Sequence, residues 1–200
     1  LALTHVRSGL HHLGVRADDA ILFERLASRV LGLDGSLRPT AVAHDHTLGP
    51  DRLWSLGISG DLPLVVVHVD GGAGSALARQ VLRAQDYWRL KGLTADVVLV
   101  NVGPGGYRDA LQDALVALLE GGPWAQWRQR TGGVFLLRAD HMSPAQMAVL
   151  AAAAAALLPD GYGDLAAHLD RPPPAPVVSP AFGVAETPAP AMAPEPAAIR

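Results

Sequence analysis

The fold is decided by residues 62–101, LPLVVVHVDGGAGSALARQVLRAQDYWRLKGLTADVVLVN. This stretch contains two continuous apolar runs, Leu64–Val69 and Asp96–Val100, which are typical of parallel strands covered on both faces. Between them, apolar side chains recur at steps of four, three and four residues, at Leu77, Val81, Ala84 and Trp88. This spacing predicts a helix that runs to about Lys91, where Gly92 is placed to end it. The stretch therefore predicts two parallel strands joined by a helix.

The same pattern continues toward the C-terminus. A second helix is indicated by Leu111, Leu115 and Leu118, and a third apolar run follows at Val134–Leu137. Ser143-Pro144-Ala145-Gln146 has the residues of a helix start, so a third helix is expected from about Pro144 to Leu158. Three strand-helix units with right-handed crossovers predict a small three-layer α/β sandwich with a mostly parallel sheet.

Three segments are expected along the chain. Residues 1–62 form a helical lead-in, with a helix that begins near Asp18 and ends at Gly32, followed by a long connection. Residues 63–170 form the α/β domain. Residues 171–200 hold nine of the sixteen prolines and form a Pro/Ala-rich linker that we expect to be disordered. The linker and the start without Met indicate an internal piece of a longer chain.

Composition excludes several classes of function. The net charge of -3 comes from 16 basic and 19 acidic side chains mixed along the chain, which argues against a nucleic-acid partner. The chain has no cysteine, so disulfides and thiolate metal sites are excluded. No apolar run approaches the roughly 20 residues that a membrane span requires, so we expect no direct membrane insertion.

Three polar residues follow or end the predicted strands: Asp70, Asn101 and Asp140. Parallel strands place their carboxyl ends at one edge of the sheet, where open α/β sheets bind ligands. These three residues are therefore candidate ligand-binding residues. The alternative is that they turn the chain and cap the helices that follow.

Two other patterns carry less information. The glycines of Gly71–Gly74 stand where a phosphate loop would, but their spacing matches no nucleotide fingerprint, which favours a flexible turn. His44-Asp45-His46 has no third or fourth ligand at a recognisable spacing, which favours a solvated loop. We therefore predict no metal site and no cofactor.

The most distinctive string in the chain is residues 53–64, LWSLGISGDLPL. It resembles the LW-x-x-GISGDLP segment of cyclic β-1,2-glucan synthases, on residues Trp54, Gly57, Ser59, Gly60, Asp61 and Pro63. HVRSGLHHLGV and FERLASRVL before it, and YWRLKGL and GGVFLLRAD after it, resemble the same family in the same order. The resemblance covers about Thr4 to Leu169.

The resemblance implies that the chain is an internal segment of a large multidomain enzyme of the inner membrane, on its cytoplasmic side, before a phosphorylase-like C-terminal part. The implied parent polymerises glucose from a nucleotide sugar, cyclises the chain and trims it by phosphorolysis. The family's catalytic residues lie in other domains, so no catalytic residue is assigned here.

Three hypotheses of function remain open. The first is a non-catalytic spacer that docks neighbouring domains of the same polypeptide, in which Trp54 covers the sheet edge or a neighbouring domain and Asp61 accepts hydrogen bonds within its turn. The second is a module that binds β-1,2-glucan or a small ligand at the strand ends, with Trp54 and Tyr107 as stacking platforms. The third is an independent enzyme of nucleotide-sugar chemistry.

Overall fold

The computed structural model describes residues 15–38, 51–104 and 109–172. They contain a four-stranded, all-parallel sheet with strand order β3-β2-β1-β4. The strands are β1 (Leu64–Val69), β2 (Asp96–Asn101), β3 (Val134–Arg138) and β4 (Ala156–Leu158). The predicted α/β fold with a parallel sheet is confirmed.

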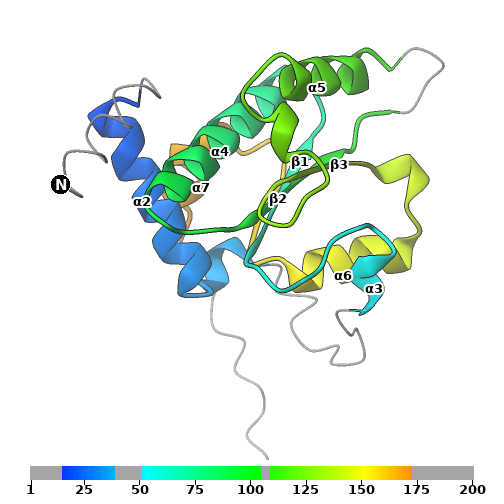
Figure 1. Cartoon of the computed structure of the whole chain (residues 1–200), viewed down its shortest axis with the longest axis horizontal. Coiled ribbons are helices and arrows are strands. Elements are labelled where there is room, and N and C mark those ends of the chain that lie inside the picture. The colour runs from blue at the N-terminus through cyan, green and yellow to red at the C-terminus, as the bar shows by residue number, and fades with distance from the viewer. Residues whose placement is uncertain (1–14, 39–50, 105–108, 173–200) are drawn as a thin grey trace, which may run out of the picture.

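Helices cover both faces of the sheet and make a three-layer arrangement (Figure 1). One face is covered by α2 (Ala17–Leu31), α4 (Gly72–Leu90), α5 (Ala110–Glu120) and α7 (Leu165–Leu169). The other face is covered by α3 (Asp51–Trp54) and α6 (Pro144–Ala153). Short 3-10 helices lie at Gly35–Leu37, Ala125–Trp127 and Ala139–His141.

The apolar runs of the sequence explain the two cores. Val65 and Val67 of β1 belong to the apolar core beneath α2 and α4, whereas Leu64 and Val66 belong to the core beneath α6. Successive side chains of a strand point to opposite faces, so a strand between two helical layers must be apolar at nearly every position. Continuous runs rather than alternation are the result.

The predicted helix before β1 is confirmed at both ends, and the predicted helix after β1 is confirmed at its C-terminal end. α2 carries Asp18 and Asp19 in its first turn and ends at the cap residue Gly32, and α4 ends at Leu90, with Gly92 at φ +83° just beyond. Trp88 is 1% exposed and its indole N–H donates to the carbonyl oxygen of Phe23 at 2.8 Å, which ties α4 to α2. α2 thus shares the core of the sheet.

The predicted helix from Pro144 to Leu158 is too long. The capping box at Ser143 forms as expected, but α6 ends at Ala153, and residues 156–158 form the edge strand β4. Ala154 has extended backbone angles, and the N–H of Ala155 donates to the carbonyl oxygen of Leu64 at 2.8 Å. Pairing with β1 satisfies backbone groups that would otherwise lie unpaired, and it buries Leu158 completely.

The long connection predicted over residues 33–57 contains more regular structure than expected. Its described part includes a 3-10 turn and the short helix α3, while residues 39–50 lie outside the described ranges. Within the described part of the chain, no helix is both long and apolar enough to cross a membrane.

Candidate functional site

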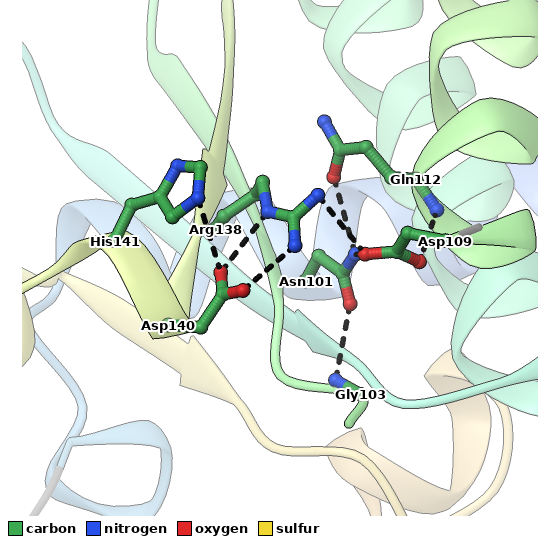
Figure 2. Close-up of polar contacts among 7 residues, drawn as sticks. All are labelled: Asn101, Gly103, Asp109, Gln112, Arg138, Asp140 and His141. Carbon is green, nitrogen blue, oxygen red and sulfur yellow. Dashed lines mark hydrogen bonds and ion pairs between the residues drawn. The ribbon is translucent and has the colours of Figure 1, made fainter. Parts of the chain in front are cut away.

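Asn101 stands at the carboxyl end of β2 and is the centre of a polar network shown in Figure 2. It is 3% exposed, and its Nδ2 donates to Asp109 Oδ2 at 3.0 Å and to Gln112 Oε1 at 3.1 Å. Its Oδ1 accepts from the N–H of Gly103 at 3.0 Å. The amide of Asn101 is therefore engaged on both sides and holds the loop after β2 against the start of α5.

Arg138, the last residue of β3, extends this network to Asp140 (Figure 2). Its Nε and Nη2 donate to the two carboxylate oxygens of Asp140 at 3.0 and 2.7 Å, and its Nη1 lies 3.2 Å from Asp109 Oδ2. The hydrogen bonds from Arg138 hold the pKa of Asp140 below its ordinary value, and those same bonds raise the pKa of Arg138. Two of the three predicted strand-end residues, Asn101 and Asp140, are thus joined through Arg138 and Asp109.

The third predicted residue, Asp70, lies outside that network. It lines a cavity of about 440 Å³ between the loop after β1 and the loop after β4. The lining residues are His68, Asp70, Gly71, Gly72, Val102, Pro159, Asp160 and Gly161. The strand-end set predicted from the sequence therefore divides into two neighbouring places at one edge of the sheet.

Asp160 is a site residue that the sequence interpretation missed. Its Oδ2 accepts from the N–H of Asp70 at 2.7 Å, and its Oδ1 accepts from the N–H of Gly161 at 2.7 Å. It follows β4, so it was hidden by the assignment of residues 156–158 to a helix. The signal that identifies it is Asp160-Gly161 directly after apolar residues and Pro159, which parallels Asp70-Gly71 after β1.

The glycine-rich segment after β1 is part of a helix and not the flexible turn that its spacing favoured. α4 begins at Gly72, so Gly72 and Gly74 stand in its first turn. A Cβ on Gly74 would lie 2.7 Å from Asp160 Oδ2 and 3.0 Å from the Cα of Val69. The missing side chain at Gly74 therefore lets α4 and Asp160 approach the end of β1 closely.

The string at residues 53–64 forms the turn that was expected of its glycines. Gly57 and Gly60 have φ values of +76° and +80°, a conformation that other residues rarely adopt. The carbonyl oxygen of Pro63 then accepts from the N–H of Asp96 at 2.9 Å, at the point where β1 and β2 begin to pair. The segment delivers the chain into the sheet.

Two predicted roles in this turn need correction. Trp54 is 66% exposed and does not cover the sheet edge, whereas its other expected roles, contact with a neighbouring domain or stacking on a ligand, stay predictions. Its indole N–H donates to the carbonyl oxygen of Ser59 at 3.1 Å, and Leu53 and Ile58 are the buried side chains. The hydrogen bond expected at the carboxylate of Asp61 is replaced by one in which the N–H of Asp61 donates to Ser59 Oγ at 3.4 Å. Adjacent residues of this turn alternate between core and solvent, and their residue types alone do not indicate which of them are buried.

Two sequence candidates lie outside the described residues: Tyr107, and the stretch His44-Asp45-His46. Among the residues that are described, no group of three or more His, Asp or Glu side chains is arranged to hold a metal ion.

The chemistry available at the cavity is that of hydrogen bonding. Burial lowers the pKa of His68, and the negative charge of Asp160 opposes this effect in part. The cavity therefore presents two carboxylates and an imidazole whose neutral form is favoured by burial, beside the first turn of α4. This set can accept and donate hydrogen bonds to a small molecule.

The fold and the site define an open parallel α/β domain with a cavity at the carboxyl ends of its strands. Over 175 aligned residues, or 85% of its length, the chain is 30% identical to the cyclic β-(1,2)-glucan synthase NdvB of Rhizobium meliloti (strain 1021). The chain is therefore related to this synthase, as the string at residues 53–64 suggested, and it spans 6% of the synthase's length. No family model matches the chain.

Proposed function

We propose that this chain is a non-catalytic α/β domain within a protein of β-1,2-glucan synthesis, where it holds neighbouring domains of the same polypeptide in a fixed arrangement. The observation that carries the proposal is the network of Figure 2, in which the polar side chains at the ends of β2 and β3 bind one another. Side chains engaged in this way fix the loops that follow the strands, which is the structural role expected of a domain that holds its neighbours in place.

Two further observations support a docking role. The related synthase is far longer than this chain, so the chain corresponds to a small part of a large assembly. The aromatic side chains of Trp54 and Tyr162 are 66% and 52% exposed, and exposed aromatic groups provide contact area for neighbouring domains.

The test is made in the complete protein that contains this segment. Residues 15–172 are replaced by a flexible Gly/Ser linker, and compactness is measured by small-angle X-ray scattering together with the amount and length of the glucan product. We expect a more expanded particle and less product, because the domains lose their fixed arrangement. Unchanged compactness and product would contradict the docking role.

The isolated chain supplies the second arm of the test. It is incubated with a β-1,2-glucan and inorganic phosphate, and separately with a nucleotide sugar, beside a heat-denatured sample. We expect no product above that control. Product formation by the isolated chain would show that the domain is catalytic.

A second candidate function, the binding of a small ligand, is favoured by the cavity between the loops after β1 and β4. Cavities of this size class, about 300–1,000 Å³, with a few convergent polar groups are where small molecules bind. Amide chemical shifts of the chain, followed during titration with candidate ligands, test this function. Shifts at Gly71, Gly72 and Gly161 are expected if it is correct.

A further inference from the structure

The cavity lies where the order of strands reverses. The chain passes from β1 to β2 and β3 on one side, and then returns to place β4 on the other side of β1. In open α/β sheets, such a reversal leaves a crevice at the carboxyl ends of the strands, and ligands bind there. The cavity is lined by the segments that follow the two strands at the reversal, Asp70–Gly72 and Pro159–Gly161.

The cavity carries negative charge that the protein does not neutralise. Within the described residues, the carboxylate of Asp70 is exposed and has no hydrogen-bond or ion-pair partner. Asp160 accepts two backbone N–H groups and has no lysine or arginine partner among the described residues. The two carboxylates therefore repel anions that approach the cavity.

Asp160 also lies beside the place that an anion would use. A phosphate at the first turn of a helix is held by backbone N–H groups that have no partner within the helix. Here Asp160 Oδ2 lies against that turn of α4, 2.7 Å from the position that a Cβ on Gly74 would occupy. The chain's own carboxylate therefore stands beside this turn, where its charge disfavours phosphates and nucleotides.

The remaining polar groups match hydroxyl groups. The carboxylates of Asp70 and Asp160 accept hydrogen bonds, and the first N–H groups of α4, together with the imidazole of His68, donate them. A hydroxyl group both donates and accepts, whereas an ammonium group donates only. A divalent metal ion is disfavoured because the described residues offer no group of three ligating side chains.

We propose that the cavity between β1 and β4 binds an uncharged polyhydroxyl molecule the size of one sugar residue, with Asp70 and Asp160 accepting hydrogen bonds from its hydroxyl groups. This proposal rests on the second candidate function and goes beyond it by naming the class of ligand. Asp160 is the residue that determines specificity, because its charge and position reject phosphate.

The proposal is tested by titrating the isotopically labelled chain, observed by NMR. The probes are glucose, the β-1,2-linked glucose disaccharide, inorganic phosphate and a nucleoside diphosphate. We expect the two neutral sugars to shift the amide signals of Gly71, Gly72 and Gly161, and the two anions to leave them unchanged. Asp70→Asn should weaken sugar binding at least fivefold, and the unshifted remainder of its spectrum shows that the variant is folded.

Two variants complete the design. Asp113→Asn removes an exposed carboxylate of α5 that does not line the cavity, and it should bind the sugars as the parent chain does. Asp160→Asn keeps a hydrogen-bond acceptor for the N–H of Asp70 but removes the charge, and it should gain measurable affinity for phosphate.

The outcomes separate this proposal from the function on which it rests. Binding of phosphate or of the nucleoside diphosphate to the parent chain at the same amides would overturn the polyhydroxyl class and leave the binding function in place. No shift with any of the four probes would overturn both. Equal sugar affinity of the parent chain and Asp70→Asn would overturn the assignment of the carboxylate.

Discussion

The close approach of α4 to β1 predicts that a single methyl group at Gly74 destabilises the protein. The Cβ of an alanine there would lie 3.0 Å from the Cα of Val69, 3.1 Å from its Cγ1 and 2.7 Å from Asp160 Oδ2. Asp160 has little freedom to withdraw, because the same oxygen accepts the N–H of Asp70. The methyl group must therefore push α4 away from the sheet or break that hydrogen bond.

Two opposing effects set the size of the change. Replacing glycine by alanine inside a helix stabilises by up to about 1 kcal/mol, whereas forcing an extra methyl group into a filled site costs about 1–3 kcal/mol. For Gly74→Ala we expect a net loss of about 1 kcal/mol in the free energy of unfolding. Gly72→Ala is the matched control, because no heavy atom lies within 4 Å of the Cβ position in that same turn. It should be neutral or slightly stabilising.

Urea unfolding followed by far-UV circular dichroism measures both variants. If Gly74→Ala proves as stable as Gly72→Ala, the packing argument at this position is wrong. Equal slopes of free energy against urea are required for the comparison, because a changed slope indicates an altered denatured or native state.

The remaining predictions concern burial and charge. Trp54→Ala should change the free energy of unfolding by less than about 1 kcal/mol, because the ring is exposed. Trp88→Ala should lower it by about 3–5 kcal/mol, because that ring is buried. Equal losses for the two variants in urea unfolding would contradict this. Burial raises the pKa of Asp96 above 3.8, so its ionisation costs stability as the pH rises from 3.8 through the raised value. Asp96→Asn should therefore gain stability relative to the parent chain as the pH rises above 3.8. A difference in the free energy of unfolding between Asp96→Asn and the parent chain that does not change with pH would contradict this prediction. Burial lowers the pKa of His168 below 6.5, and its two ring nitrogens have no hydrogen-bond partner in the described structure. The neutral form of His168 therefore supports folding above pH 6.5, and this support is lost as the pH falls below that value. His168→Leu should lose less stability than the parent chain on acidification. Free energies of unfolding that fall in parallel for the two proteins would argue against this.

The strands and helices with strong patterns could be predicted from the sequence, because a buried parallel strand and an amphipathic helix leave different apolar spacings. β4 could not be predicted in this way. It follows a run of alanines, and the break at Ala154 is marked by neither glycine nor proline. Pairing with β1 decides the structure of those residues, and a contact between segments so far apart in the chain leaves no local pattern.

The failure to predict β4 also limited the prediction of the site. Asn101 and Asp140 were correctly placed at one edge, but the cavity depends on Asp160, whose position follows from β4. The Asp-Gly step after an apolar run, present at both Asp70 and Asp160, is the signal that sequence analysis can use. The expectation that Trp54 covers the sheet edge failed for another reason, since two adjacent apolar residues of a short helix give no indication of which one faces the core.

The pairing of β4 with β1 also has a consequence for how the chain is made. β1 is apolar on both faces, and one of its edges meets β4 through the pairs Val65 with Ala156 and Val67 with Leu158. During synthesis that edge stays open until residue 158 has left the ribosome, long after β1 itself is complete. An open apolar strand is a template for pairing with another chain. Fragments that stop before residue 156 are therefore expected to aggregate, whereas those that extend past Leu158 cover the edge.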